Sequence, residues 1–145
     1  MEALKHAHSG LRWIALILLL VAIVNAAKSQ NSGNYMKKDK MINLFAMIFL
    51  HIQLLIGLGL YFSSSKVNFI EGWMSEEILR FYGMEHLIGM LLAIIIVSRG
   101  RSNAEKKMKG SRNKHRKILK TYLIALILIL AFIPWPFRGL GAGWM

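Results

Sequence analysis

One apolar stretch decides the fold: residues 41–62 read MINLFAMIFLHIQLLIGLGLYF. In helical form, about 20 mainly apolar residues are enough to cross the hydrocarbon core of a bilayer, and this stretch contains no Lys, Arg, Asp or Glu. Three further apolar runs occupy residues 11–27, 81–97 and 118–132. The chain as a whole is 55% hydrophobic, with a mean hydropathy of +0.44. We therefore expect an all-α integral membrane protein with four spans, forming one domain over residues 1–145.

The net charge of +12 is concentrated between these runs. Residues 28–40 contain four basic side chains and one acidic side chain, and residues 99–120 contain ten basic and one acidic. Because cytoplasmic loops of membrane proteins carry an excess of Lys and Arg, both segments are expected in the cytoplasm. The four helices would then form an up-down bundle with both termini on the outer, periplasmic side. This placement explains the basic charge, so we expect the lipid bilayer as partner and no nucleic acid.

The chain contains no cysteine. This excludes disulfides, iron–sulfur clusters, thiolate metal sites and haem attached through thioethers. The glycine-rich tail, residues 139–143, follows no strand and precedes no Lys-Ser/Thr pair, so it is not a phosphate-binding loop. We expect a flexible outer terminus there.

Each apolar run carries or borders a histidine: His8, His51, His86 and His115. Ionisable side chains within a bilayer are costly and tend to be functional. Imidazole is also the commonest protein ligand for metals and a frequent ligand of haem iron. The recurrence therefore predicts a cofactor held between membrane helices.

The depth of each histidine narrows this prediction. At a rise of 1.5 Å per residue, His51 lies roughly 16 Å and His86 roughly 8 Å below the outer end of its span. Helix tilt and a slanted macrocycle could absorb that difference, so His51 and His86 are the predicted axial ligands of one metal. His8, at the outer edge of the first run, is the alternative ligand. His115 lies on the far side and is expected to bind nothing.

Other polar side chains accompany the histidines. Arg12 lies one helical turn after His8, where its guanidinium suits a haem propionate, Glu85 or a phospholipid headgroup. Glu85 is the only acid within the runs; it could orient an imidazole, relay protons, or pair with Arg12 or Arg80. Gln53 could form a hydrogen bond across helices, either to support a ligating histidine or as part of a proton relay.

Two small residues, Gly83 and Gly89, lie one turn on either side of His86. Residues three or four apart share a helix face, so these glycines could leave space for a cofactor beside the imidazole. Close packing between helices is an equally good explanation, because small residues serve that purpose in membranes.

Four motifs together resemble small four-span bacterial membrane proteins labelled cytochrome b-like: HSGLRW (8–13), LHIQLLIG (50–57), RFYGMEH (80–86) and IPWP (133–136). The resemblance implies a non-covalent b-type haem, electron transfer and a multi-pass location in the bacterial cytoplasmic membrane. By this resemblance, His8, His51 and His86 are the candidate ligands of the haem iron. Respiratory cytochromes b carry two histidines on one helix for stacked haems, whereas each run here has one, so one haem is expected.

Together these observations predict a membrane electron-transfer protein with one bis-histidine haem b in the outer half of the bundle. It would be an electron carrier or a subunit rather than a stand-alone enzyme, exchanging electrons with a redox partner or a quinone. One alternative is a non-redox accessory subunit of a larger membrane complex. Another is transport of protons or a metal through a cluster of Glu85 and the histidines.

Overall fold

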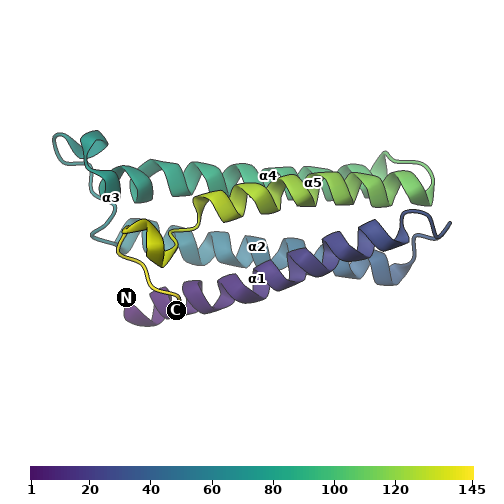
Figure 1. The fold of residues 1–145 in the computed structure, drawn as a ribbon, viewed down its shortest axis with the longest axis horizontal. Coiled ribbons are helices and arrows are strands. Elements are labelled where there is room, and N and C mark those ends of the chain that lie inside the picture. Colours follow the sequence, from purple (N-terminus) through teal and green to yellow (C-terminus); the bar gives the residue numbers. More distant parts are fainter.

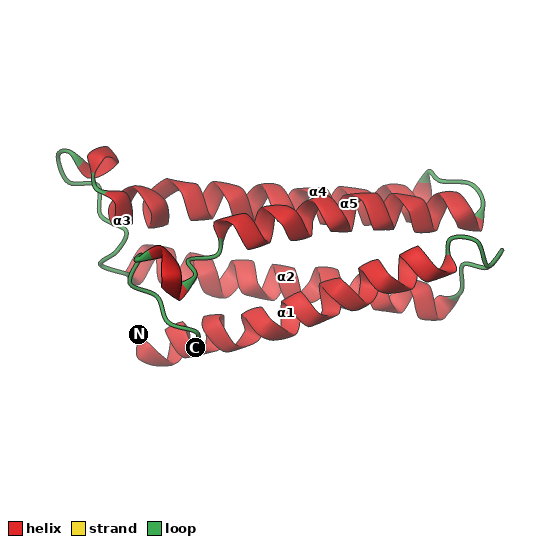
Figure 2. Cartoon of the chain, viewed as in Figure 1, coloured by secondary structure: helices red, strands yellow, loops and turns green.

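The computed structural model describes residues 1–145, and its regular structure is entirely helical (Figures 1 and 2). Helices α1 and α2 are neighbours, as are α2 and α4, α4 and α5, and α5 and α1, so the four close into a bundle. Both chain termini lie at the same end of it (Figure 1). The four long helices are α1 (Glu2–Ser29), α2 (Lys37–Ser63), α4 (His86–Lys106) and α5 (Ser111–Phe132).

Three of the four expected spans are confirmed as helices long and apolar enough to cross a membrane. They are α1, α2 and the continuous helical segment Glu77–Lys106. Helix α5 does not meet that description, because basic side chains occupy its first half up to Lys120. The apolar part that follows, residues 121–132, is only about 18 Å long, against a hydrocarbon thickness of about 30 Å.

The helices are longer than the apolar runs that predicted them. Helix α1 begins at Glu2 rather than near residue 11, and the third helical segment continues to Lys106 rather than ending near residue 97. The added turns are mostly polar, and they include good helix formers such as Ala3, Lys5 and Glu105. Hydropathy identifies only the apolar part of such a helix.

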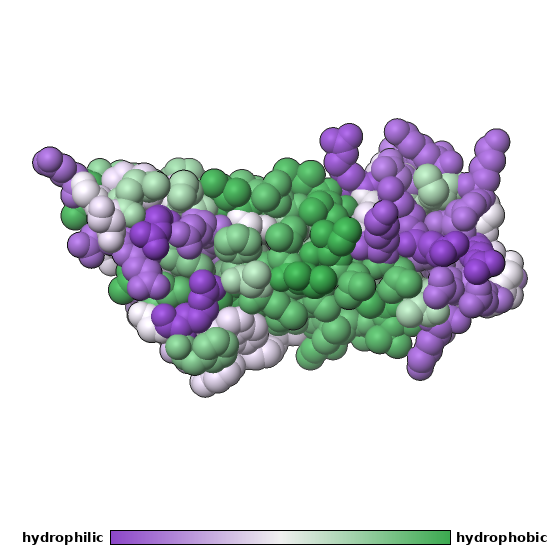
Figure 3. Space-filling model, turned by 45° about the horizontal axis from the view of Figure 1, so that its top comes forward, coloured by the Kyte–Doolittle hydropathy of each residue, from purple (hydrophilic) through white to green (hydrophobic).

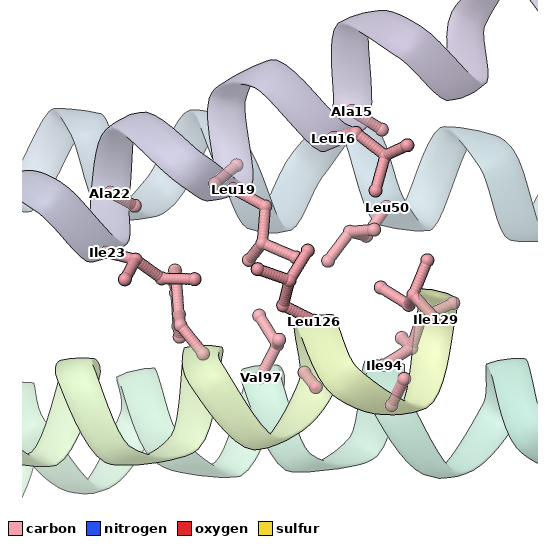
Figure 4. Packing of buried hydrophobic residues seen from close by; sticks show 14 of the residues in the cluster. Ala15, Leu16, Leu19, Ala22, Ile23, Leu50, Ile94, Val97, Leu126 and Ile129 are labelled. Carbon is pink, nitrogen blue, oxygen red and sulfur yellow. The ribbon is translucent and has the colours of Figure 1, made fainter. Parts of the chain in front are cut away.

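The core lies between the α1–α2 pair and the α4–α5 pair (Figure 4). Leu19, Val97 and Leu126 interdigitate there, while alanines bring the helix backbones close together. At Gly100 the approach is closest, because an added Cβ would lie 2.1 Å from the Thr121 hydroxyl oxygen. This contact fixes α4 against α5 through van der Waals packing, the main source of helix association in membranes.

We call the end formed by the α1–α2 and α4–α5 connections the basic end, because charged side chains cover it (Figure 3). On the face that Figure 3 shows, the surface between this end and the opposite one is mostly hydrophobic. Outward-facing apolar side chains include Ile17, Phe45, Leu55, Ile95 and Ile127, each at least half exposed. An apolar belt of this kind is expected of a bundle surrounded by lipid.

Inside the basic end, buried polar groups join the helices. The Asp39 carboxylate accepts hydrogen bonds from Asn25 Nδ2 (2.8 Å) and from the Met36 backbone N–H (2.7 Å). The Tyr122 hydroxyl donates to the Asn43 carbonyl oxygen at 2.7 Å. These bonds tie α1 to α2 and α2 to α5 where the chain turns.

Tyr35, in the connection between α1 and α2, belongs to the same network. Its hydroxyl donates to the Glu105 carboxylate and accepts a hydrogen bond from the Asn43 amide. Burial, together with the hydrogen bond to Glu105, raises the pKa of the Tyr35 phenol. The phenol therefore remains a neutral donor, and the α1–α2 connection is held onto α4.

Candidate ligand cavity

A cavity of about 480 Å³ lies at the end of the bundle opposite the basic end. We call this the cavity end; it also holds both termini (Figure 1). Apolar side chains make up 16 of the 30 lining residues. Binding sites for small molecules and cofactors commonly measure ~300–1,000 Å³ and combine apolar walls with a few polar groups. The polar groups that converge here include His8, Arg12, Gln53, Lys66 and His86.

His86 is held by the end of helix α5. Its Nδ1 lies 2.7 Å from the Phe132 carbonyl oxygen, and because a carbonyl only accepts, Nδ1 is the protonated nitrogen. Phe132 has no helical donor, since the residue four positions on is Pro136, which lacks an N–H. The imidazole therefore satisfies an orphan carbonyl, and its Nε2 keeps a lone pair available for a metal or a donor.

The chain just before His86 is wound more loosely than an α-helix. After α3 (Glu77–Arg80), residues Phe81–Glu85 form a π-helical turn, η2, before α4 begins. Such wide turns often occur at functional sites, because they rotate the following side chains relative to the helix before them. Here the turn sets the direction of His86, the first residue of α4.

Neither glycine beside His86 provides open space. An added Cβ at Gly89 would lie 2.3 Å from the Phe132 ring, and one at Gly83 would lie 3.3 Å from the Phe69 ring. Both glycines therefore serve close packing. Gly89 also matters for His86, because it lets Phe132 approach α4 closely enough for its carbonyl to reach the imidazole.

His8 lies across from His86 in the same cavity. The centres of the two rings are 6.4 Å apart, and the ring planes are inclined at 78°. Gly57 gives the His8 ring room, because an added Cβ there would lie 3.2 Å from His8 Cε1. The buried Nδ1 of His8 has no hydrogen-bond partner.

Two further predicted residues, Arg12 and Gln53, line the cavity. Gln53 Nε2 donates to the backbone oxygen of His8 at 2.9 Å, which ties α2 to α1 beneath the imidazole. The Arg12 guanidinium donates to the Trp144 carbonyl oxygen at 2.7 Å. The buried Arg12 Nε has no partner, so part of this cation remains available to an anionic group.

The structure does not bring His51 to His86. Leu50 lines the cavity, and the next residue on an α-helix points about 100° away. His51 Nδ1 instead lies 2.8 Å from the Met47 carbonyl oxygen, and Nε2 lies 3.4 Å from the Ser98 hydroxyl. Both ring nitrogens are thus near partners within the bundle, outside the cavity.

Glu85 and His115 also lie outside the cavity. The Glu85 carboxylate pairs with Arg80 Nε at 2.8 Å, one of the arrangements that the sequence left open. His115 is fully buried at the basic end, where its Nε2 lies 2.8 Å from the Asn34 carbonyl oxygen. The cluster of Glu85 with the histidines is therefore not formed. No three His, Asp or Glu side chains lie close enough together to hold a metal ion.

The C-terminal tail was expected to be flexible, but it folds across the cavity end. Leu140 is buried, and its carbonyl oxygen accepts a hydrogen bond from the Tyr82 hydroxyl at 3.1 Å. Lys66 Nζ donates to the Gly141 carbonyl oxygen. The positive φ angles of Gly139 (67°) and Gly141 (68°) provide the turns that this path needs.

Sequence reasoning missed Lys66 as a cavity residue, whereas helical spacing already placed Tyr82 on the face of His86. Lys66 follows α2 (Lys37–Ser63) in a polar loop, and its ammonium lies 4.8 Å from the centre of the Tyr82 ring. Burial, with a smaller contribution from the charge of Lys5, lowers the pKa of Lys66. Only the folded position of the tail reveals Lys66, because no periodic pattern connects residues 66 and 141.

These features define an all-helical bundle with three helices long and apolar enough to cross a membrane and a histidine-lined cavity at one end. No family model, curated protein or solved structure matches the chain.

Proposed function

We propose that this protein binds one non-covalent b-type haem in the cavity, with His8 and His86 as axial ligands, and transfers electrons in a membrane. The single observation that carries the proposal is the pair of imidazoles on α1 and α4, with ring centres 6.4 Å apart in one cavity. The sequence favoured His51 as the partner of His86. We now prefer His8, because it shares the cavity with His86 and His51 does not.

The spacing of the two rings suits ligation of one metal ion. Bonds from a metal to a histidine nitrogen measure about 2.0–2.1 Å, so two imidazoles on opposite sides of one ion have ring centres roughly 6 Å apart. The protonated Nδ1 of His86 leaves Nε2 as the nitrogen that can ligate. A hydrogen bond from the other ring nitrogen to a backbone carbonyl is a common feature of metal-bound histidine.

The remaining lining also suits a haem. Leu16, Leu50 and Ile129 provide apolar walls for a macrocycle. Arg12 and Lys66 are cations at the same cavity and can pair with carboxylates such as propionates. Four-helix bundles commonly hold cofactors between facing helices in this way.

A bound haem would supply one-electron chemistry at its iron. The residues of this chain would set the conditions for it. The Phe132 carbonyl orients His86 and increases the basicity of its Nε2 through the bond to Nδ1. The apolar walls exclude water and lower the local dielectric constant, two of the means by which a protein tunes a redox potential.

We also propose that all four long helices span the bacterial cytoplasmic membrane. Helix α5 presents Leu123, Ile124, Ile127 and Leu130 outward, each between 40% and 60% exposed, which suits lipid contact. The segment Ile133–Phe137 could add to its short apolar length. The excess of Lys and Arg then favours a cytoplasmic basic end, with the termini and the cavity on the outer side.

The test is a reduced-minus-oxidised spectrum of protein purified after expression with haem supplied. We expect a sharp b-type α-band that is absent in His8→Ala and His86→Ala. The band should persist in His51→Ala, because His51 lies outside the cavity. The thermal unfolding midpoint of each variant shows whether a lost band reflects a lost fold.

A colourless, haem-free wild-type preparation would refute the haem proposal and favour the accessory-subunit alternative. Loss of the band in His51→Ala, with retention in His8→Ala, would instead support His51 and His86 as the ligands, the pair that the sequence predicted from depth. We do not propose transport through Glu85 and the histidines, because Glu85 is paired with Arg80 away from the cavity.

A further inference from the structure

A second hollow lies on the outer surface of the bundle. It is a shallow, open groove between α1 and α2, near the basic end. Its eight lining residues include the apolar side chains Ile17, Leu20, Val21, Val24 and Ile42. The two lysines of the groove, Lys28 and Lys38, lie in the last turn of α1 and the first turn of α2.

The apolar side of the groove follows one face of α1. Residues 17, 20, 21, 24 and 28 recur at the spacing of a single helical stripe. From Ile17 to Lys28 the stripe is about 16 Å long. That length matches one leaflet of the bilayer, about half of the ~30 Å hydrocarbon core. The stripe can therefore contact an acyl chain along its length and end where the headgroups begin.

The two lysines have no carboxylate partner. Neither Lys28 nor Lys38 takes part in a salt bridge, although Asp39 is adjacent to Lys38 in sequence. The Asp39 carboxylate is buried, and its two oxygens accept from Asn25 and from the Met36 N–H. The hydrogen bond to Asn25 also holds α1 and α2 together beneath the lysines. Both ammonium groups are exposed and free to pair with an external anion.

We propose that this groove binds an anionic phospholipid from the leaflet at the basic end. Its phosphate lies between Lys28 and Lys38, and one acyl chain lies along the stripe from Val24 to Ile17. An acyl chain matches the apolar stripe, and an anionic headgroup matches the two unpaired lysines. A lipid of that leaflet supplies both groups at this separation. The proposal is independent of haem.

The experiment is native mass spectrometry of the full chain in detergent, titrated with phosphatidylglycerol or with phosphatidylcholine of the same acyl chains. We expect tighter retention of one phosphatidylglycerol molecule. Juxtamembrane lysines each add about 1 kcal/mol of attraction to anionic lipid, so Lys28→Gln or Lys38→Gln should weaken binding about fivefold, and the double variant about 25-fold.

Two further variants distinguish lipid binding in the groove from attraction of the lipid to surface charge in general. Lys106→Gln/Lys107→Gln removes the same charge from exposed positions outside the groove and should leave binding unchanged. Val24→Trp keeps both lysines but obstructs the stripe, and should weaken retention. Equal binding of the two lipids would overturn the proposal. So would an equal loss in the two lysine pairs, or unchanged binding in Lys28→Gln/Lys38→Gln.

Discussion

At the cavity end, the imidazoles of His8 and His86 line a space of about 480 Å³, whereas at the basic end the imidazole of His115 is fully enclosed by protein. Both ends bury polar groups between the same four helices. At the basic end most of these groups bond to one another or to the backbone, as with Asp39 and Tyr122. Each end holds a buried imidazole Nδ1 without a hydrogen-bond partner, that of His115 at the basic end and that of His8 at the cavity end, but only His8 lies beside the cavity.

The difference shows that a buried histidine is not by itself evidence of a site. His115 stacks edge-on against Tyr35, with ring centres 4.9 Å apart, and fills space that the helices would otherwise leave empty. His8 and His86 lie beside unfilled space. A cavity between two imidazoles is therefore a better indicator of ligand binding than the presence of histidine in an apolar helix.

The largest expected effect comes from Gly89→Ala, which tests the link between α5 and His86. The new Cβ would lie 2.3 Å from the Phe132 ring, and overpacking of this kind destabilises by about 1–3 kcal/mol. Displacement of Phe132 should also weaken its bond to His86 and lower the yield of bound haem. Thermal unfolding and the haem absorbance measure the two effects.

Gly10→Ala is the matched control, because a Cβ there meets no atom within 4 Å. It should be neutral or stabilising, by up to about 1 kcal/mol, since Ala favours helix over Gly. If Gly89→Ala were as stable as wild type and kept its haem, the Phe132 ring would be free to move aside, and the proposed positioning of His86 would be wrong.

An effect of about 1–3 kcal/mol is expected from Asp39→Ala at the basic end, because it removes the two hydrogen bonds that the buried carboxylate accepts, from the half-buried Asn25 amide and from the Met36 N–H. The unfolding midpoint should fall while the haem spectrum stays unchanged. Lys37→Ala, at an exposed neighbouring position, should change stability by no more than about 0.5 kcal/mol. A spectral change in Asp39→Ala would mean that the two ends are coupled rather than separate.

The smallest effect is expected from Tyr82→Phe, which removes the hydrogen bond to the Leu140 carbonyl. Such a bond contributes about 0.5–1.5 kcal/mol, so the tail should detach more often and a carboxypeptidase should remove it up to about tenfold faster. Tyr61→Phe loses a comparable bond, to the Gly83 carbonyl, without touching the tail. Equal trimming of both variants would show that Tyr82 does not hold the tail.

The sequence was sufficient for the helical architecture, because apolar runs and turn residues are local signals. It was less successful with helix ends and with α5, whose basic first half shortens the apolar part. The depth of each histidine in the membrane could not decide whether His8 or His51 pairs with His86, because the answer depends on which face of α2 meets the cavity. Leu50 faces it and His51 does not, and this rotation follows from contacts among all four helices.

The prediction for the tail was wrong, and the role of the glycines stayed open, for a related reason. Gly83 and Gly89 have a spacing that is equally consistent with open space and with close packing. The rings that decide between these two explanations, Phe69 for Gly83 and Phe132 for Gly89, belong to other segments of the chain. The fixed position of Leu140 depends on Tyr82, which belongs to another helical segment. Contacts between residues so distant in sequence leave no periodic trace.

The carbonyl of Phe132 has one more consequence, which is electrostatic. It is the last carbonyl of α5, so it lies at the helix end where aligned peptide dipoles leave about half a negative charge. The imidazole of His86 is bonded directly to that end. Helix α5 thus acts on the cavity as a built-in counter-ion that no acidic side chain supplies. It favours the more positive of any two charge states that a group bound at His86 can adopt.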